Sequence, residues 1–195
     1  MAINIGLVGT NGAGKSTACD WFITQGFKCV SLSDQVRAAA TEQGLPHDRA
    51  TLIAIGSQLK EEYGPAVLAQ RAIDSTSQYD NVVFDSIRHP LEIQLLKTFD
   101  CIVIGIDAPL ELRYDRVQQR KKETDIVSFD VFKEQDQLER SGVSSGQSID
   151  ACMALCDIQL MNDRDYSELW MGLEDQDLKL VPDLLEEEVE KYPQE

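Results

Sequence analysis

Basic residues are scarce in this 195-residue sequence, which holds 18 lysines and arginines against 34 aspartates and glutamates, a net charge of −16. A field of this sign repels the phosphate backbone of nucleic acids and the surface of anionic membranes. The composition therefore argues against nucleic-acid or membrane partners. A small anionic ligand stays compatible with it, because a local cluster of positive groups can override the net charge.

Long apolar runs are also missing, since no stretch approaches the roughly 20 apolar residues of a membrane-spanning helix. The opening residues 1–4 carry no basic leader and do not resemble a signal peptide. The cysteines include no CxxC pair and no histidine at zinc-site spacing, so we predict reduced, buried thiols and a cytoplasmic location. There are five: Cys19, Cys29, Cys101, Cys152 and Cys156.

Short apolar runs alternate with longer segments of helical period, as in a parallel sheet covered by helices. The predicted strands are 3–8, 28–31, 82–85, 101–106 and 158–161. The predicted helices are 15–25, 34–43, 49–63, 66–75, 90–97, 109–122, 129–140 and 165–171. We expect one α/β domain over residues 1–170 and, because nine of the last 25 residues are acidic, a solvated acidic tail over 171–195.

The clearest motif joins the first predicted strand to the first predicted helix: residues 9–16, GTNGAGKS, fit the pattern GxxxxGK[ST]. The glycines let the backbone aim its N–H groups at phosphate oxygens, and the helix N-terminus adds partial positive charge there. In such loops the lysine, here Lys15, reaches the β- and γ-phosphates, and the hydroxyl of Ser16 is a ligand of Mg²⁺. We therefore predict a site for ATP and Mg²⁺. Cofactor contacts are expected from Gly9, Asn11, Gly12, Ala13, Gly14, Lys15, Ser16 and Thr17.

A carboxylate follows another apolar run, because Asp85 ends the strand predicted over 82–85. Magnesium–nucleotide sites use a carboxylate at the end of a strand beside the phosphate-binding loop. We predict that Asp85 contacts the metal or acts in catalysis.

With these motifs the chain resembles the nucleoside and nucleotide kinase branch of the P-loop proteins, which includes adenylate, cytidylate and dephospho-CoA kinases. It is similar to a group of adenylate-kinase-like or dephospho-CoA-kinase-like proteins that is related to domains joined to deoxycytidylate deaminases. The resemblance implies a three-layer α/β fold with a five-stranded parallel sheet in the order 2-3-1-4-5, an acceptor-binding helical region at about 34–80 and a lid at about 121–148. The matching segments are LSDQVR (32–37), KEEYG (60–64), FDSIRHPLE (84–92), IDAP (106–109) with Arg113 and Arg116, and CDIQLMND (156–163).

Two arginines are candidates for binding an anionic phosphoryl acceptor. Arg37 lies one turn into the helix predicted after the second strand, and Arg88 follows Asp85 by three residues. A guanidinium offers a planar pair of donors that matches a phosphate. Ser33 and Asp34 either bind the acceptor too or act as an ordinary helix N-cap.

Arg113, Arg116 and Arg120 share one face of the helix predicted over 109–122, because they are spaced by three and four residues. At a lid edge such a stripe can neutralise charge on the transferring phosphoryl group, whereas the alternative is a solvent-exposed face balanced by nearby acids. We predict that Arg116 and Arg120 act in the transition state. Asn162 follows the last predicted strand, where the resemblance implies contact with adenine; a plain turn is the alternative interpretation.

These residues favour an ATP- and Mg²⁺-dependent kinase of a small phosphorylated acceptor, with Lys15, Asp85, Arg116 and Arg120 as catalytic residues. The resemblance implies a nucleoside monophosphate, with a pyrimidine or deoxyribonucleotide preferred. Dephospho-CoA is the alternative acceptor; it exposes a ribose hydroxyl, for which Asp34 is the candidate base. A nucleotide-dependent switch or binding module without an acceptor is the alternative from another class, although no NKxD-type guanine-binding segment supports it.

Overall fold

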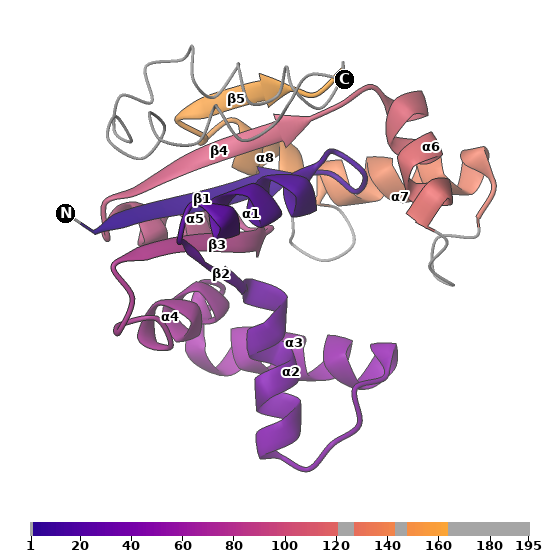
Figure 1. Cartoon of the computed structure of the whole chain (residues 1–195). Coiled ribbons are helices and arrows are strands. Elements are labelled where there is room, and N and C mark those ends of the chain that lie inside the picture. Colours follow the sequence, from indigo (N-terminus) through magenta and orange to yellow (C-terminus); the bar gives the residue numbers. More distant parts are fainter. Residues whose placement is uncertain (1, 121–126, 143–147, 164–195) are drawn as a thin grey trace.

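The computed structural model describes residues 2–120, 127–142 and 148–163. Its centre is a five-stranded parallel sheet in the order β2-β3-β1-β4-β5, which confirms the expected α/β fold and strand order (Figure 1). Every predicted strand is present, and three of them extend one to three residues beyond the prediction. The strands are β1 (Ile3–Gly9), β2 (Lys28–Ser31), β3 (Asn81–Ile87), β4 (Cys101–Asp107) and β5 (Ile158–Met161).

The helices follow the predicted segments closely, with two differences. Helix α2 begins at Leu32 with Ser31 as its N-cap residue, so the interpretation of Ser33 or Asp34 as the N-cap is wrong. Helix α8 lies outside every predicted segment and starts where the hydroxyl of Ser148 accepts from the Ala151 N–H. The helices are α1 (Lys15–Thr24), α2 (Leu32–Glu42), α3 (Arg49–Tyr63), α4 (Val67–Asp74), α5 (Pro90–Lys97), α6 (Leu110–Arg120), α7 (Phe129–Ser141) and α8 (Ile149–Met153).

Several predictions fall on parts of the chain outside the described residues. These are the helix at 165–171, the acidic tail at 171–195, and residues 121–126 and 143–147 of the expected lid. Within the described ranges, no helix is long and apolar enough to cross a membrane.

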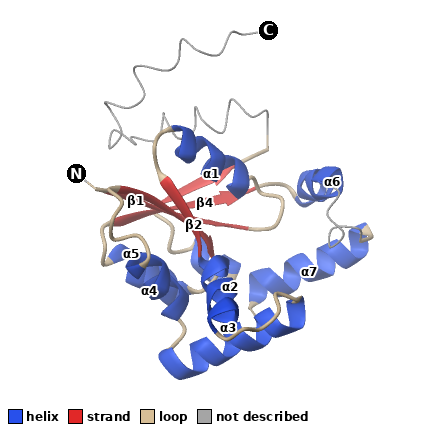
Figure 2. Ribbon diagram, turned by 60° about the horizontal axis from the view of Figure 1, so that its bottom comes forward, coloured by secondary structure: helices blue, strands red, loops and turns tan. Residues whose placement is uncertain are grey.

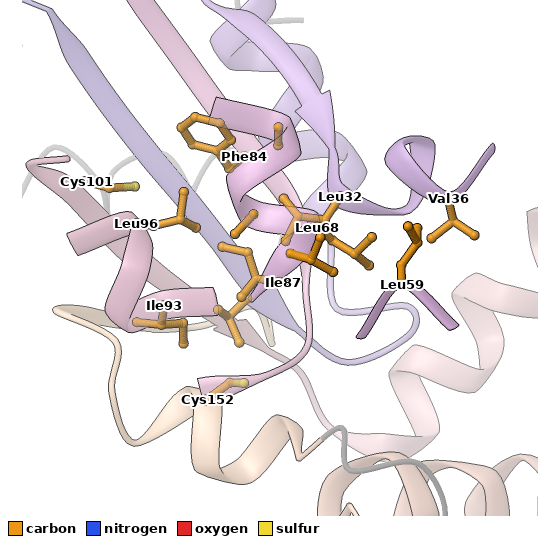
Figure 3. Close-up of a cluster of buried hydrophobic side chains, with 14 of the residues drawn as sticks. Leu32, Val36, Leu59, Leu68, Phe84, Ile87, Ile93, Leu96, Cys101 and Cys152 are labelled. Atoms are coloured by element: carbon orange, nitrogen blue, oxygen red, sulfur yellow. The ribbon is translucent and has the colours of Figure 1, made fainter. Parts of the chain in front are cut away.

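The helices cover both faces of the sheet, as Figure 2 shows with α1 on one side and α4 and α5 on the other. Alternation along β3 divides its side chains between two cores: Val83 packs with the α1 face, whereas Val82 and Phe84 pack with α2, α4 and α5. Because both faces are buried, the strand is apolar without a polar alternation, which is why its sequence is a continuous apolar run. Figure 3 shows the second core, where Phe84 and Ile87 lie among side chains from these helices and α8.

The predicted reduced state of the thiols is wrong for one pair, because Cys19 of α1 and Cys29 of β2 form a disulfide. Packing of α1 against the β2 edge brings their Cα atoms to 6.2 Å, within the range that a disulfide spans. The other three cysteines of the described chain are free, as predicted. Burial raises the pKa of Cys101, Cys152 and Cys156 to about 12, so these thiols are poor nucleophiles at neutral pH.

Candidate functional site

The phosphate-binding loop runs from the end of β1 to the start of α1, as the motif predicts. Gly12 and Gly14 have φ values of +80° and +110°, a region that side-chain-bearing residues rarely adopt. A Cβ at Gly14 would also collide with the side-chain amide of Asn162. The loop therefore requires glycine at this position for conformation and for space.

Lys15 folds back over the loop, where its ammonium donates to the carbonyl oxygens of Gly9 (2.7 Å) and Thr10 (2.8 Å). Loss of water around the ammonium lowers the pKa of Lys15 to about 8, and the Asp85 carboxylate opposes this shift. The oxygens of a bound phosphate would accept hydrogen bonds from the same ammonium. Their negative charge would stabilise the charged form of Lys15, which burial disfavours. The side chain is thus placed to exchange two carbonyl acceptors for a phosphate.

Asp85 carries the feature that best fits a metal ion. Among the described residues, its Oδ1 is a buried side-chain oxygen without a hydrogen-bond partner, while Oδ2 accepts from the hydroxyl of Ser86 at 3.1 Å. No group of three or more His, Cys, Asp or Glu in the described ranges could hold a metal alone. Mg²⁺ fits such a site, because it keeps several waters and takes one or two protein ligands beside the phosphates. Asp85, with the exposed Ser16 at the start of α1, could supply those ligands.

Asp107, at the end of β4, is not among the predicted site residues, although it ends an apolar run in the segment IDAP as Asp85 ends its own. Its Oδ1 accepts from the hydroxyl of the buried Thr10 at 3.0 Å, and its Oδ2 accepts from Arg140 at 2.6 Å. Burial works to raise the pKa of Asp107, but the Arg140 hydrogen bond holds it below its usual range. This ionised carboxylate ties the phosphate-binding loop to α7.

The three arginines of α6 have different surroundings. Arg113 is 1% exposed and forms a two-pronged pair with Asp136 of α7, at 2.6 and 3.0 Å. Its position is structural, so the expected common face of three lid arginines is wrong at Arg113. Arg116 and Arg120 lie at the phosphate-binding loop, where Arg120 donates to the side-chain oxygen of Asn11 at 2.8 Å.

Asn162 connects Arg116 to the loop. Arg116 donates to the backbone and side-chain oxygens of Asn162, both at 3.2 Å, and the Asn162 amide donates to the Ala13 carbonyl at 2.8 Å. Asn162 is 8% exposed, so this contact is largely shielded from water. The structure therefore brings Asn162 and Arg116 to the predicted nucleotide site, and the contact of Asn162 with adenine stays a prediction.

The predicted acceptor-binding residues follow β2 and β3, which are neighbours in the sheet. Arg37 of α2 pairs with Asp34 and donates to the Ser33 hydroxyl at 3.3 Å. Arg88 pairs with Glu139 of α7 at 3.3 Å, and both side chains are more than one-third exposed. Both arginines are accessible and form weak ion pairs that a stronger anion can replace.

Two acidic residues in this region are not among the predicted site residues, although Glu92 ends the matching segment FDSIRHPLE. Burial lowers the pKa of Lys15, and the negative charge of Glu139 partly opposes this shift. Glu139 therefore lies near the loop as well as beside Arg88. Glu92, 2% exposed, accepts from the backbone N–H groups of Arg88 and His89 at 2.9 and 3.0 Å. Burial raises the pKa of Glu92. A Glu three residues after a histidine N-cap is a capping-box pattern that could have identified it.

The chain belongs to the AAA_18 family, described as an AAA domain, whose profile matches residues 5–140. It is 30% identical over 171 residues to the UPF0200/UPF0201 protein of Archaeoglobus fulgidus, covering 84% of this chain but only 51% of that protein. It is 26% identical over 176 residues to UPF0200 protein PH1008 of Pyrococcus horikoshii, covering 86% and 92%.

Solved structures share the fold across nearly the whole chain. TT1252 from Thermus thermophilus has a TM-score of 0.62 and 19% identity, covering 92% of this chain and 98% of that one. Shikimate kinase from Acinetobacter baumannii in complex with shikimate has a TM-score of 0.56 and 17% identity, covering 94% and 96%. At these identities the likeness shows the fold alone, which is P-loop kinase-like as expected; the nucleoside and nucleotide kinase branch stays a prediction.

Proposed function

We propose that this chain transfers the γ-phosphoryl group of ATP, with Mg²⁺, to a small phosphorylated acceptor, for which a nucleoside monophosphate with a pyrimidine base or deoxyribose is the favoured class. One observation carries the proposal: the phosphate-binding Lys15 and the accessible Arg88 gather near Asp85 at the carboxyl-terminal ends of β1 and β3. The accessible Arg37 is joined to the same carboxylate by hydrogen bonds that pass through three serines, Ser33, Ser31 and Ser86. Lys15 has electrostatic contact with both Asp85 and Arg88. Donor and acceptor phosphates would therefore lie side by side.

The donor side binds the nucleotide through the loop and the N-terminus of α1. Lys15 leaves the carbonyls of Gly9 and Thr10 and donates to the β- and γ-phosphates instead. Ser16 and Asp85 would hold Mg²⁺, which would offset phosphate charge. Arg116 and Arg120 are held beside the loop by Asn162 and Asn11, and we assign them to charge neutralisation at the transferring group.

The acceptor side binds an anion through Arg37 and Arg88, with Ser33 and Asp34 at the start of α2. Transfer to a phosphate oxygen needs little general-base help, so positioning and charge neutralisation dominate the catalysis. The segment at about 121–148 is proposed as the lid that keeps water from the γ-phosphate.

A phosphotransfer screen tests the proposal. Purified chain is incubated with ATP, Mg²⁺ and one acceptor at a time, and products are identified by mass spectrometry with the Lys15→Ala variant as the blank. The panel holds ribo- and deoxyribonucleoside monophosphates, dephospho-CoA and shikimate. We expect conversion of a nucleoside monophosphate far above the blank. Inert acceptors together with slow ATP hydrolysis would instead favour a nucleotide-dependent switch.

A second acceptor class has one observation in its favour. Asp34 is an exposed carboxylate at the first turn of α2, oriented by Arg37, and could serve as the base for a hydroxyl acceptor. The fold neighbours include a kinase solved with shikimate, and dephospho-CoA is the hydroxyl acceptor implied by the family resemblance. The Asp34→Asn variant separates the classes: it should greatly lower kcat toward a hydroxyl acceptor but not toward a phosphate acceptor.

A further inference from the structure

The pairing of β3 with β1 is irregular at the predicted metal-binding carboxylate. Gly6 pairs with Phe84 and Val8 pairs with Ile87, so Asp85 and Ser86 together face a single residue of β1. This is a β-bulge, a device that re-aims side chains and is common beside active sites. Regular alternation would direct the side chains of Asp85 and Ser86 to opposite faces of the sheet. At the bulge the Ser86 hydroxyl instead donates to Asp85 Oδ2.

The backbone of Ser86 is itself unusual. Its φ is +65°, in the left-handed region, which glycine occupies freely and which is unfavourable for other residues. A serine at this position gives up backbone stability while it supplies a hydroxyl to the neighbouring carboxylate. Backbone strain of this kind is concentrated at functional sites.

A chain of hydroxyl groups continues from Ser86 toward the acceptor side. Ser31 donates to Ser86 at 2.9 Å, the hydroxyls of Ser31 and Ser33 lie 2.8 Å apart, and Arg37 donates to Ser33 at 3.3 Å. The two ends fix the direction of every bond, because a guanidinium only donates and a carboxylate only accepts. Each serine then accepts one hydrogen bond and donates the next. Such a directional chain strengthens its terminal bond to the carboxylate.

The carboxylate that receives this chain has its other oxygen available. Asp85 Oδ1 is buried and has no partner among the described residues. A carboxylate that could rotate would alternate its two oxygens between the Ser86 hydroxyl and the predicted metal position. With Oδ2 held by Ser86, the orientation is set before a ligand arrives.

Building on the proposed function, we propose that Ser86 is a positioning residue for Asp85: its hydroxyl holds Oδ2, so that Oδ1 is presented to the metal of the nucleotide complex, and Ser31 orients the Ser86 hydroxyl. The bulge and the positive φ of Ser86 are the backbone features that make this contact.

Metal-dependent nucleotide binding tests the proposal without relying on turnover. Mn²⁺ serves as the probe, and its binding to the full chain with a non-hydrolysable ATP analogue is followed by electron paramagnetic resonance. Affinity for the metal-free analogue is measured by calorimetry in the presence of a chelator. We expect Ser86→Ala to weaken Mn²⁺–nucleotide binding roughly tenfold, as for loss of one hydrogen bond to a charged group, and to leave metal-free binding unchanged.

Further variants separate the hydroxyl from the backbone. Ser86→Gly removes the hydroxyl but accepts the positive φ, so it should fold well and lose the same affinity. Ser31→Ala should have a smaller effect, and the double variant should match Ser86→Ala because the two serines act in series. Ser75→Ala is the matched control, since within the described part of the chain that hydroxyl donates to a helix carbonyl of α4 alone, the Ala72 oxygen at 2.8 Å.

The outcomes that would overturn the proposal are distinct from failure of the proposed function. Suppose that Ser86→Gly keeps wild-type Mn²⁺ affinity, or that Ser86→Ala keeps it while Asp85→Asn loses Mn²⁺ affinity. Either result would show that Ser86 is not a positioning residue and would leave the assignment of Asp85 intact. Equal loss of metal-bound and metal-free affinity in Ser86→Gly would show a distorted loop and also overturns it. If Asp85→Asn itself binds the Mn²⁺ complex normally, the assignment of Asp85 in the proposed function is wrong.

Discussion

The ion pair between Arg113 and Asp136 gives the sharpest stability prediction, because both side chains are almost inaccessible, at 2% and 8% exposure. Asp136 accepts two hydrogen bonds from Arg113 and a third from Arg140 at 3.1 Å. The Asp136→Ala variant leaves the Arg113 guanidinium buried without this partner. Removing one member of a buried pair costs about 3–5 kcal/mol of unfolding free energy. For a chain of this length that corresponds to a fall in Tm of about 6–20 °C.

Urea unfolding followed by tryptophan fluorescence measures the effect. The control is Glu42→Gln, which breaks the pair with Arg71 where Glu42 is 62% exposed, and it should cost about 0–1 kcal/mol. Replacing both buried partners, by Arg113→Met with Asp136→Leu, should give a more stable protein than Asp136→Ala alone. A loss below about 1 kcal/mol in Asp136→Ala would refute the view that this pair anchors α7 to α6.

Three further predictions concern ligand binding. The pKa of Lys15 is about 8 in the free protein, below its usual 10.5, and bound phosphate favours the charged form. ATP affinity should therefore be nearly constant between about pH 7 and pH 8, where the phosphate stays ionised, and should fall up to about tenfold per pH unit above that range. A flat calorimetric profile above pH 8 would contradict this. Gly14→Ala should abolish ATP binding. The control is Gly44→Ala, which should bind ATP normally because this glycine also has a positive φ but has no described atom within 4 Å of an added Cβ. Equal ATP affinity of the two variants in the same titration would contradict the loop geometry. Glu139→Gln releases Arg88 from a partly exposed ion pair worth about 0–1 kcal/mol, so the KM of the best acceptor should fall by up to about fivefold. A higher KM would instead place Glu139 in the acceptor-binding site.

Strand positions could be predicted because they depend on local pattern. The run Val82-Val83-Phe84 is apolar since both faces of β3 are covered, and this is visible without knowing what covers them. The order of strands followed from the family resemblance. The bulge at Ser86 could not be predicted, because it depends on the register between β3 and β1, which are far apart in sequence.

The candidate site also contains residues that the sequence predicts and residues that it does not. The motif predicts Lys15 and its loop, since residues adjacent in sequence build both. Helical spacing placed Arg113 with the other α6 arginines, but its partner Asp136 lies 23 residues away on α7 and holds it inside. The disulfide of Cys19 and Cys29 likewise depends on how α1 packs on β2 rather than on a sequence motif. Tertiary contacts decide these positions, and a single sequence does not contain them.

The fate of the γ-phosphoryl group tests the central claim most directly. Wild-type chain and the Lys15→Ala variant are given γ-labelled ATP, Mg²⁺ and the best acceptor of the screen, and the label is followed in acceptor and in inorganic phosphate. The account predicts that wild-type protein places the label on the acceptor and that Lys15→Ala does not. Label found only in inorganic phosphate, or equal transfer by the two proteins, would contradict phosphoryl transfer at this site.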